Sequence, residues 1–361
     1  MTGFVPPPYP YDRLDGAKAA ASAHDGGIVD LSIGTPNDPP PPAVVAALST
    51  SDTERGYPAS TGNTRLREAA VGWMGRRFGV EVPLDGVAAC VGTKELVANV
   101  VGWLRLRDPD RDTVLYPSIS YPTYEMGAIL AGCRAVPYDH LSAIDDADAA
   151  RALCLWVNSP ANPTGALTNL GLAADWGRGC GVPVLSDECY AEFTWDGLPH
   201  TILEHGLDGV LAVHSLSKRS NLAGLRIGFY AGDGDLVHYL SEVRKHAGFM
   251  VPGPIQAAAV IALDDDAHVD EQRERYLERL WYFADVLRSE GAKVDLPGGS
   301  FYLWAAAPDG DAWAFTNHLA EKGGVLVAPG EFFGPAGAGW VRVAMVQPMD
   351  RLRLAAARLA G

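Results

Sequence analysis

The stretch from Val210 to Arg226 reads VLAVHSLSKRSNLAGLR and gives the clearest indication of the architecture of this chain. Its first five residues form an apolar, β-branched run that predicts a buried strand, and a polar segment with Ser215, Ser217 and Lys218 follows at once. In open parallel α/β sheets, ligands bind just beyond the carboxyl ends of the strands. The stretch therefore predicts one strand of such a sheet with a binding site at its end.

An apolar run followed by a polar cluster occurs twice more upstream. Leu153–Val157 precedes the cluster NSPANPTG, which begins at Asn158, and Pro183–Leu185 precedes the cluster SDECY, which begins at Ser186. Each cluster alone is also typical of a turn, a helix cap or a solvated side chain. Because the carboxyl ends of parallel strands meet at one edge of a sheet, the three clusters together predict a single site.

From about residue 87 onward, short β-branched runs alternate with longer segments that suit helices, which is the signature of βαβ units. The candidate strands are Val87–Val91, Thr113–Tyr116, Ala135–Tyr138, Leu153–Val157, Pro183–Leu185, Val210–His214 and Ile227–Ala231. The candidate helices are Lys94–Leu106, Pro122–Ala131, Leu170–Cys180, Leu236–Lys245 and the long amphipathic Val269–Arg288. We therefore expect an α/β fold whose large domain has a mostly parallel, doubly wound sheet.

The pattern changes after the long helix to a compact segment, which predicts a smaller α+β C-terminal domain. Its candidate elements are Phe301–Ala306, a helix near Ala312–Glu321, Val325–Ala328, Trp340–Met345 and a closing helix from Met349. The Pro-rich start of the chain predicts an extended arm, and the four prolines at 39–42 predict a turn. We expect residues 1–44 to form this arm and part of the small domain, residues 45–270 the large domain and residues 271–361 the small C-terminal domain.

Composition excludes several classes of protein. The 361 residues include 29 Lys+Arg and 44 Asp+Glu, and the formal net charge of −15 speaks against nucleic-acid binding. No apolar run approaches the roughly 18 residues of a membrane helix, and the first residues lack the pattern of a secretory signal, so we expect a cytoplasmic protein without membrane contact. The five cysteines show no C-x-x-C pair, so we expect neither a structural metal nor a disulfide framework.

The order of polar residues along the chain resembles that of the fold-type I (class I/II) pyridoxal-phosphate aminotransferases: Asn162, then Asp187 with Tyr190 three residues on, then Lys218 and Arg226. The resemblance covers nearly the whole chain, and its further motifs are Ile33-Gly34-Thr35-Pro36, Tyr57, Gly92-Thr93-Lys94-Glu95 and Trp340-Val341-Arg342. Within that family, the run 215–224 is most similar to the actinobacterial succinyldiaminopimelate aminotransferases. The resemblance implies pyridoxal 5'-phosphate as cofactor, amino and 2-oxo acids as partners, and a homodimer with shared active sites.

Three residues are candidates for catalysis, and their chemistry agrees with the roles that the resemblance implies. A lysine that attacks a carbonyl must be an uncharged amine beside other polarising groups, which suits Lys218, and the freed amine can then act as general base and acid. Asp187, after an apolar strand, is the candidate carboxylate that keeps the cofactor's ring nitrogen protonated. Tyr190 and Asn162 offer a hydroxyl and an amide to the phenolate oxygen of the cofactor.

The cofactor phosphate should lie at a helix N-terminus, where unpaired N–H groups favour an anion. Thr93 and Lys94, between a predicted strand and a predicted helix, provide such a terminus, although a plain turn has the same local pattern. Ser215 and Arg226 match the remaining phosphate ligands of the family, with the guanidinium suited to bidentate contact. Ser217 is a secondary candidate.

Two tyrosines have roles that only the resemblance suggests. Tyr121 matches the aromatic residue that stacks on the pyridine ring, although a core aromatic residue at a helix start is the alternative. Tyr57 matches a tyrosine that reaches the phosphate of the neighbouring subunit. If so, the active unit is at least a dimer.

Arg342 is the candidate for substrate recognition, because a guanidinium holds an α-carboxylate by two parallel hydrogen bonds. Gly34 would add backbone contacts to the same carboxylate, and Asn162 is a third candidate for substrate binding. Arg244 and Lys245 are weaker candidates for distal carboxylates of the substrate. They precede the stretch 249–254, which differs from the usual family pattern.

The resemblance implies an aminotransferase that takes the amino group of glutamate and delivers it to a 2-oxo acid, with N-succinyl-LL-2-amino-6-oxopimelate of lysine and diaminopimelate biosynthesis as the expected acceptor. The alternatives are an aminotransferase of broad specificity, a fold-type I lyase, and a non-catalytic cofactor-binding sensor. No helix-turn-helix domain or basic patch accompanies the pattern, which disfavours the sensor. No G-x-G-x-x-G follows a strand, which disfavours a nucleotide-dependent dehydrogenase.

Overall fold

The protein is represented by a computed structural model that describes residues 4–361. The chain divides into two compact units. The smaller unit contains the residues up to Gly34 together with Tyr276–Leu296 and Phe301–Gly361, and the larger unit contains Thr35–Arg275 and Pro297–Ser300. No helix within the described residues is long and apolar enough to cross a bilayer.

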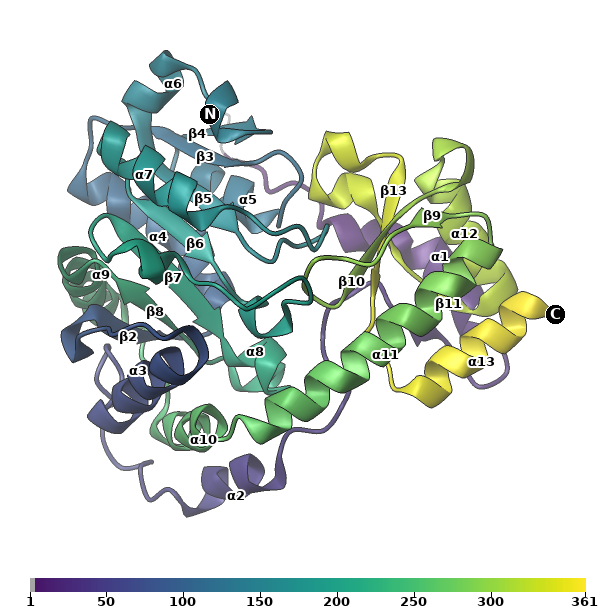
Figure 1. The fold of residues 1–361 in the computed structure, drawn as a ribbon, viewed down its shortest axis with the longest axis horizontal. Helices are drawn as coiled ribbons and strands as arrows, with labels where there is room; N and C mark the ends of the chain where they lie inside the picture. The colour runs from purple at the N-terminus through teal and green to yellow at the C-terminus, as the bar shows by residue number, and fades with distance from the viewer. Residues whose placement is uncertain (1–3) are drawn as a thin grey trace. The chain divides into compact units, whose positions relative to one another are not determined.

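A seven-stranded sheet forms the centre of the larger unit (Figure 1). In spatial order its strands are β2 (Val87–Cys90), β8 (Gly228–Gly232), β7 (Val210–Ser215), β6 (Val184–Asp187), β5 (Ala152–Asn158), β3 (Thr113–Pro117) and β4 (Arg134–Tyr138). The neighbouring strands from β7 to β4 are parallel, whereas β8 runs antiparallel to both β7 and β2. The mostly parallel sheet predicted from the sequence is thus confirmed.

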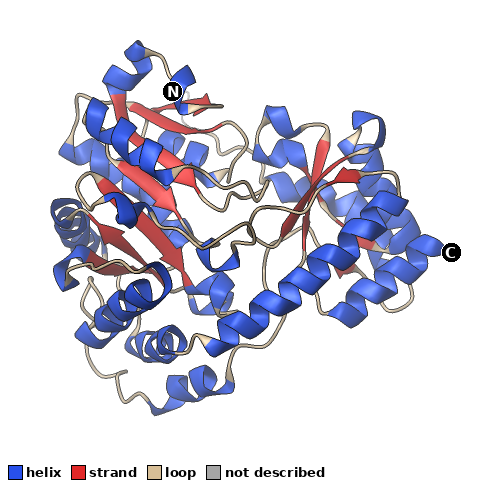
Figure 2. Ribbon diagram, viewed as in Figure 1, coloured by secondary structure: helices blue, strands red, loops and turns tan. Residues whose placement is uncertain are grey.

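Helices cover both faces of this sheet, as Figure 2 shows in blue around the red strands. One face packs against α3 (Thr64–Phe78), α7 (Leu170–Cys180) and α10 (Gly253–Asp264), and the other against α4 (Thr93–Arg107), α5 (Thr123–Leu130) and α9 (Gly234–Ala247). The other α-helices that lie wholly within this unit are α2 (Pro42–Thr50), α6 (Asp146–Arg151) and α8 (Leu216–Arg219).

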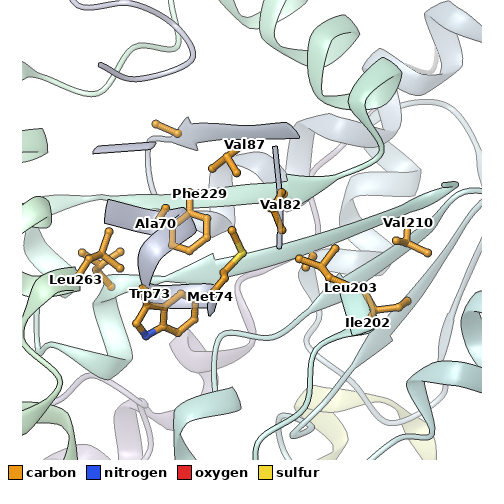
Figure 3. Close-up of a cluster of buried hydrophobic side chains, with 14 of the residues drawn as sticks. Ala70, Trp73, Met74, Val82, Val87, Ile202, Leu203, Val210, Phe229 and Leu263 are labelled. Atoms are coloured by element: carbon orange, nitrogen blue, oxygen red, sulfur yellow. The ribbon is translucent and has the colours of Figure 1, made fainter. Parts of the chain in front are cut away.

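The two hydrophobic cores follow from the alternation of side chains along each strand. In β7, Val210 and Ala212 point into the first core, and Leu211 and Val213 into the second. Figure 3 shows part of the first core, where Trp73 of α3 lies beside Phe229 of β8. Full burial of a side chain such as Val, Leu or Phe contributes about 1.5–3 kcal/mol. Because both faces are covered, the strands read as continuous apolar runs in the sequence.

The smaller unit contains a four-stranded antiparallel sheet and a separate two-stranded parallel pair. The first sheet has the order β12 (Ala328–Pro329), β13 (Trp340–Ala344), β10 (Tyr302–Ala306) and β9 (Lys293–Val294), and the pair consists of β1 (Val29–Asp30) and β11 (Val325–Leu326). Its helices are α1 (Asp15–Ser22), α12 (Ala312–Gly323) and α13 (Met349–Ala360). Helix α11 (Ala267–Ser289) contributes its residues up to Arg275 to the larger unit and the rest to the smaller one.

Helix α1 follows the Pro-rich start, with Ala17 and Ala21 buried. Two local predictions were wrong. The proline run does not end in a turn, because Pro42 opens α2, and proline suits the first helical position, where no N–H is needed. The predicted strand Val325–Ala328 is two short strands that pair with different partners on either side of Val327.

Candidate active site

Three strands of the larger unit deliver their polar clusters to one edge of the sheet. Asn158 at the end of β5 is in register with Asp187 at the end of β6, and Asp187 is in register with Val213 of β7. The Asn158 amide donates to the Asp187 carbonyl over 2.8 Å, and the N–H of Glu188 donates to the Val213 carbonyl over 2.9 Å. Parallel pairing thus gathers these segments, as the order of the clusters predicts.

Asp187 is a buried carboxylate with defined partners. Its Oδ2 accepts a hydrogen bond from the Tyr124 hydroxyl over 2.8 Å, and its Oδ1 accepts one from the Cys189 N–H over 3.2 Å. Burial raises the pKa of Asp187, while the bonds from Cys189 and Tyr124 and the nearby charge of Lys218 act in the opposite direction. A further cationic partner would stabilise the charged form of this buried carboxylate.

Tyr124 is a site residue that the sequence analysis did not single out. Its ring is fully buried, stacks on Trp156 at a centroid distance of 4.8 Å, and lies edge-on to Tyr121 at 5.8 Å. Burial and the neighbouring Asp187 raise the pKa of Tyr124 well above its ordinary value, so the hydroxyl remains a donor. The available signal was that a tyrosine buried in an apolar helix needs a partner for its hydroxyl.

Asn162 and Tyr190 both lie buried at this edge. The N–H of Asn162 donates to Asn158 Oδ1 over 2.7 Å, so that Asn158 connects the Asn162 loop with the end of β6. Tyr190 is the residue that precedes the short 3₁₀ helix η4 (Ala191–Phe193). Asn158 is therefore a second residue of the site that the sequence analysis did not assign.

Lys218 lies in α8, the single-turn helix that follows β7 directly (Figure 1). Ser215 caps this turn, since its hydroxyl oxygen accepts the N–H of Ser217 over 3.1 Å. Lys218 is half-buried, and its charge acts on the Asp187 carboxylate. The predicted catalytic lysine and the predicted catalytic carboxylate are thus brought together.

A cationic cradle lies at the start of α4. Gly92 has a φ of 74°, and a Cβ there would lie 2.2 Å from Nη2 of Arg226, so only glycine allows this approach. Partial burial and the nearby Arg226 guanidinium lower the pKa of Lys94, although its side chain remains accessible to solvent. Two cations beside the N-terminus of a 15-residue helix form a site for an anion with more than one negative charge.

Thr93 connects this cradle with the carboxylate. Its hydroxyl accepts a hydrogen bond from the Cys189 thiol over 3.4 Å, and its methyl group lies against Gly228, which pairs with Ser215 across β8 and β7. Thr93, Ser215 and Arg226 therefore surround one region, as their assignment to one phosphate group requires. Tyr57, by contrast, is fully exposed in the loop before α3.

The smaller unit brings Gly34 and Arg342 together. Arg342 is buried and lies between the rings of Tyr302 and Phe333, with its guanidinium carbon 4.4 and 4.5 Å from the two ring centroids. A Cβ at Gly34 would lie 2.0 Å from the Tyr302 hydroxyl, so this position also requires glycine. Nη2 of Arg342 donates to the Ser32 carbonyl over 2.5 Å and to the Tyr11 hydroxyl over 2.9 Å. The arginine is held in a fixed orientation.

The structure does not favour Arg244 as a ligand for distal carboxylates. Arg244 is fully buried and donates to both carboxylate oxygens of Glu95, over 2.5 and 3.0 Å. Its guanidinium also lies over the rings of Trp103 and Phe249. The charge of Arg244 is thus committed to the core of the larger unit, while Lys245 is exposed and pairs with Glu242.

A cavity of about 380 Å³ lies away from this site, at the amino ends of the parallel strands. Two of its charged side chains are engaged in the fold itself: Arg111 donates to the carbonyls of Ala152 and Gly181, and Asp233 caps α9. We assign no ligand to it.

Comparison with known proteins identifies the family. Residues 26–359 match the family model "Aminotransferase class I and II", so the chain belongs to this family of pyridoxal-phosphate-dependent transaminases. It is 45% identical to a protein of Mycobacterium tuberculosis named a probable aminotransferase, over 98% of this chain and 85% of that protein. It is 42% identical to 4-dedimethylamino-4-oxo-anhydrotetracycline transaminase OxyQ of Streptomyces rimosus, over 98% and 99%.

Relatives with other named substrates are more distant. The LL-diaminopimelate aminotransferase of Desulforudis audaxviator is 34% identical over 98% of this chain and 95% of its own. Among solved structures, substrate-bound BacF of Bacillus subtilis superposes with a TM-score of 0.88 at 30% identity, over 98% and 95% of the two chains. A probable N-succinyldiaminopimelate aminotransferase of Thermus thermophilus superposes with a TM-score of 0.86 at 32% identity, over 97% and 98%.

The residues of the larger unit fit pyridoxal phosphate. Asp187 offers a buried carboxylate of the kind that a protonated ring nitrogen needs, and Lys218 lies close enough to act on it electrostatically. Lys94 and Arg226 offer two positive charges at a helix N-terminus for the phosphate. Gly92 lies beside them, and a Cβ at this position would collide with Arg226. The larger unit therefore offers an acceptor for the ring nitrogen and donors for the phosphate of the cofactor.

Proposed function

We propose that this aminotransferase takes the amino group of glutamate and delivers it to the 6-oxo group of N-succinyl-LL-2-amino-6-oxopimelate. The observation that carries the chemistry is the buried Asp187 carboxylate beside Lys218. The choice of acceptor is supported by the run 215–224 and by relatives named as diaminopimelate and N-succinyldiaminopimelate aminotransferases.

Five residues act on the reacting part of the cofactor in this proposal, one of them through Asp187. Pyridoxal phosphate, when bound, supplies an electron sink for the bonds at the substrate Cα. Asp187 holds a proton at the ring nitrogen, and Tyr124 keeps that carboxylate in place. The Lys218 amine takes the proton from the substrate Cα and returns it to the C4′ atom of the cofactor. Asn162 and Tyr190 donate to the phenolate oxygen.

The anionic groups are bound at two separate places. Thr93, Lys94, Ser215, Ser217 and Arg226 hold the phosphate, and Tyr121 stacks on the ring. In the smaller unit, the Arg342 guanidinium gives two parallel hydrogen bonds to the substrate α-carboxylate. Gly34 and Asn162 complete the substrate contacts. We also propose a homodimer in which Tyr57, fully exposed here, reaches the phosphate of the neighbouring subunit.

A second acceptor class is favoured by one specific observation. The identity to the tetracycline-pathway transaminase, 42% over nearly the full length of both chains, exceeds the 34% identity to the diaminopimelate aminotransferase. The second candidate is therefore the ring ketone of a fused-ring polyketide, again with an amino acid as donor.

A direct competition between acceptors tests the proposal. The purified holoenzyme is given L-glutamate and either an N-succinylated 2-amino-6-oxopimelate or a 4-oxo-anhydrotetracycline, and 2-oxoglutarate formation is measured. We expect a kcat/KM for the succinylated acceptor at least about 100-fold higher than for the ring ketone, which corresponds to about 3 kcal/mol. The reverse order assigns the enzyme to the polyketide, and turnover of neither refutes both.

A further inference from the structure

Glu192 is a buried carboxylate that receives three hydrogen bonds in the larger unit. Its Oε1 accepts from the Trp73 indole N–H over 2.7 Å and from Nε of Arg219 over 3.2 Å, and its Oε2 accepts from Nε of Arg77 over 2.9 Å. The side chain is 4% exposed. Glu192 lies in η4, two residues after Tyr190.

Most of the Arg219 guanidinium is also bonded, whereas its Nη2 has no hydrogen-bond partner among the described residues and lies 3.9 Å from Oδ1 of Asp266. Its Nη1 donates to the Ala262 carbonyl over 2.7 Å and to the Ser220 hydroxyl over 3.1 Å, and its guanidinium carbon lies 5.5 Å from the Trp73 ring centroid. Burial lowers the pKa of Arg219, and the Glu192 carboxylate opposes that effect. The guanidinium is therefore a rigid anchor between α8, α10 and η4.

We propose that Arg219 and Glu192 form a positioning pair that fixes the turn of Lys218 against the turn of Tyr190. Lys218 and Arg219 are adjacent in α8, and Tyr190 and Glu192 lie two residues apart. The ion pair thus connects α8, which carries the Lys218 amine, with the segment that carries the Tyr190 hydroxyl. This inference rests on the roles proposed above for Lys218 and Tyr190.

The energetics of buried ion pairs favour a positioning role over a stabilising one. Taking two charges out of water costs several kcal/mol per ion in principle, and apolar replacement of such a pair is often neutral or stabilising. A fixed amine is valuable for proton transfer, since a displacement of about 1 Å can cost about 100-fold in rate. The pair therefore gives the site precision at little or no net gain in stability.

Arg77 supplies a matched control. It donates to the same Glu192 carboxylate and also to Asp270 over 3.1 Å, yet it lies in α3, far along the chain from both catalytic turns. Lysine keeps the charge but not the planar fork of arginine. Arg77→Lys and Arg219→Lys therefore each weaken a hydrogen bond to the Glu192 carboxylate. Only Arg219→Lys also loosens the turn that contains Lys218.

The test compares the unchanged holoenzyme with Arg219→Lys and Arg77→Lys. Three quantities are measured: the unfolding temperature, the kcat and KM of the reaction with L-glutamate, and the pH midpoint of the visible absorbance change of the bound cofactor. We expect Arg219→Lys to lower kcat by about 10- to 100-fold with little change in KM, and to shift the pH midpoint. Arg77→Lys should lower the unfolding temperature and leave kcat and the midpoint unchanged.

Equal effects of the two variants on kcat and midpoint would overturn the proposal, and so would an unchanged kcat and midpoint in Arg219→Lys. If Arg219→Lys does not fold, Glu192→Gln takes its place. The amide oxygen can still accept from Trp73 and from Nε of Arg219, while the charge is lost and the amide nitrogen faces Arg77, whose own effect Arg77→Lys measures. The expected result is then a reduced kcat and a shifted midpoint. If the unchanged holoenzyme has no visible band or does not respond to glutamate, the proposed function fails instead, so the two failures are distinguishable.

Discussion

The Tyr124 hydroxyl donates a hydrogen bond to the Asp187 carboxylate over 2.8 Å, from helix α5 to the end of strand β6. Both side chains are buried, and the tyrosine ring is held by stacking on Trp156. A buried carboxylate that keeps such a donor retains its negative charge more readily. The relationship prepares Asp187 to act on a protonated ring nitrogen.

Tyr124→Phe should therefore weaken the carboxylate as a partner for the cofactor. A hydrogen bond to a charged group contributes about 1.5–3 kcal/mol, so we expect the rate with glutamate to fall by about 10- to 100-fold. Tyr138→Phe is the control, because its hydroxyl donates to the Trp156 carbonyl over 2.7 Å and not to the site. Stopped-flow measurement of the reaction with glutamate checks this, and equal rates in the two variants would remove Tyr124 from the role.

Gly92→Ala should disturb the phosphate cradle. The new Cβ would lie 2.2 Å from Nη2 of Arg226 at a φ of 74°, so the guanidinium has to move. We expect at least about a 10-fold loss of pyridoxal-phosphate affinity, equivalent to one hydrogen bond to a charged group, measured by equilibrium dialysis. Gly79→Ala is the matched control, since it has a φ of 71° but nothing within 4 Å of its Cβ. Similar affinities in the two variants would contradict the assignment.

Arg342→Lys should impair recognition of the α-carboxylate. Lysine keeps the charge but cannot give two parallel hydrogen bonds, so we expect KM to rise by about 10-fold or more for amino and 2-oxo acids together. Steady-state kinetics with both substrates provide the measurement. An unchanged KM for either substrate would exclude this role for Arg342.

The pair His214 and Glu188 predicts how stability depends on pH. Burial lowers the pKa of His214 to about 3 and raises the pKa of Glu188 to about 7. The unfolded chain binds more protons at His214 between pH 3 and its ordinary value of 6.5, so this residue reduces stability as the pH falls through that window. Glu188 has the opposite effect between its ordinary 4.5 and about 7, because the folded chain then binds more protons.

The two effects oppose each other above about pH 4.5, so the loss of stability should appear below that value, with a slope of up to about 1.4 kcal/mol per pH unit. His214→Phe should make this acid limb shallower while keeping the aromatic contact with Trp73, at 5.0 Å between centroids. Urea unfolding at several pH values measures the limb. The exposed His238→Gln is the control and should keep the acid limb of the unchanged protein. The prediction would be contradicted if the acid limb of His214→Phe were as steep as that of either protein.

Much of the sheet was predictable because its strands are buried on both faces. Such strands read as apolar runs, as in Val210–His214, and the alternation with helices identifies parallel pairing. Helices α2 and α10 were missed, because both begin at prolines that resemble turn residues: Pro42 opens α2, and Pro252 precedes α10. The local sequence does not distinguish a proline in a turn from a proline that starts a helix.

The site was predictable where polar residues follow strands and not where partners come from elsewhere. Asp187 and Lys218 stand out because charge directly follows an apolar run. Tyr124 and Glu192 do not, since a tyrosine in an apolar helix reads as core and a single glutamate reads as surface. Their partners are distant in sequence, 63 residues for Tyr124 with Asp187 and 27 for Glu192 with Arg219, so only the fold brings them together.

In the proposed reaction, Lys218 holds pyridoxal phosphate beside Asp187, and the enzyme transfers amino groups. The most direct measurement is the visible absorbance spectrum of the purified protein and of Lys218→Ala, before and after addition of excess glutamate and then of a 2-oxo acid. We expect a visible band in the unchanged protein that glutamate removes and the 2-oxo acid restores, and no such cycle in Lys218→Ala. A band that ignores glutamate, or a full cycle in Lys218→Ala, would contradict it.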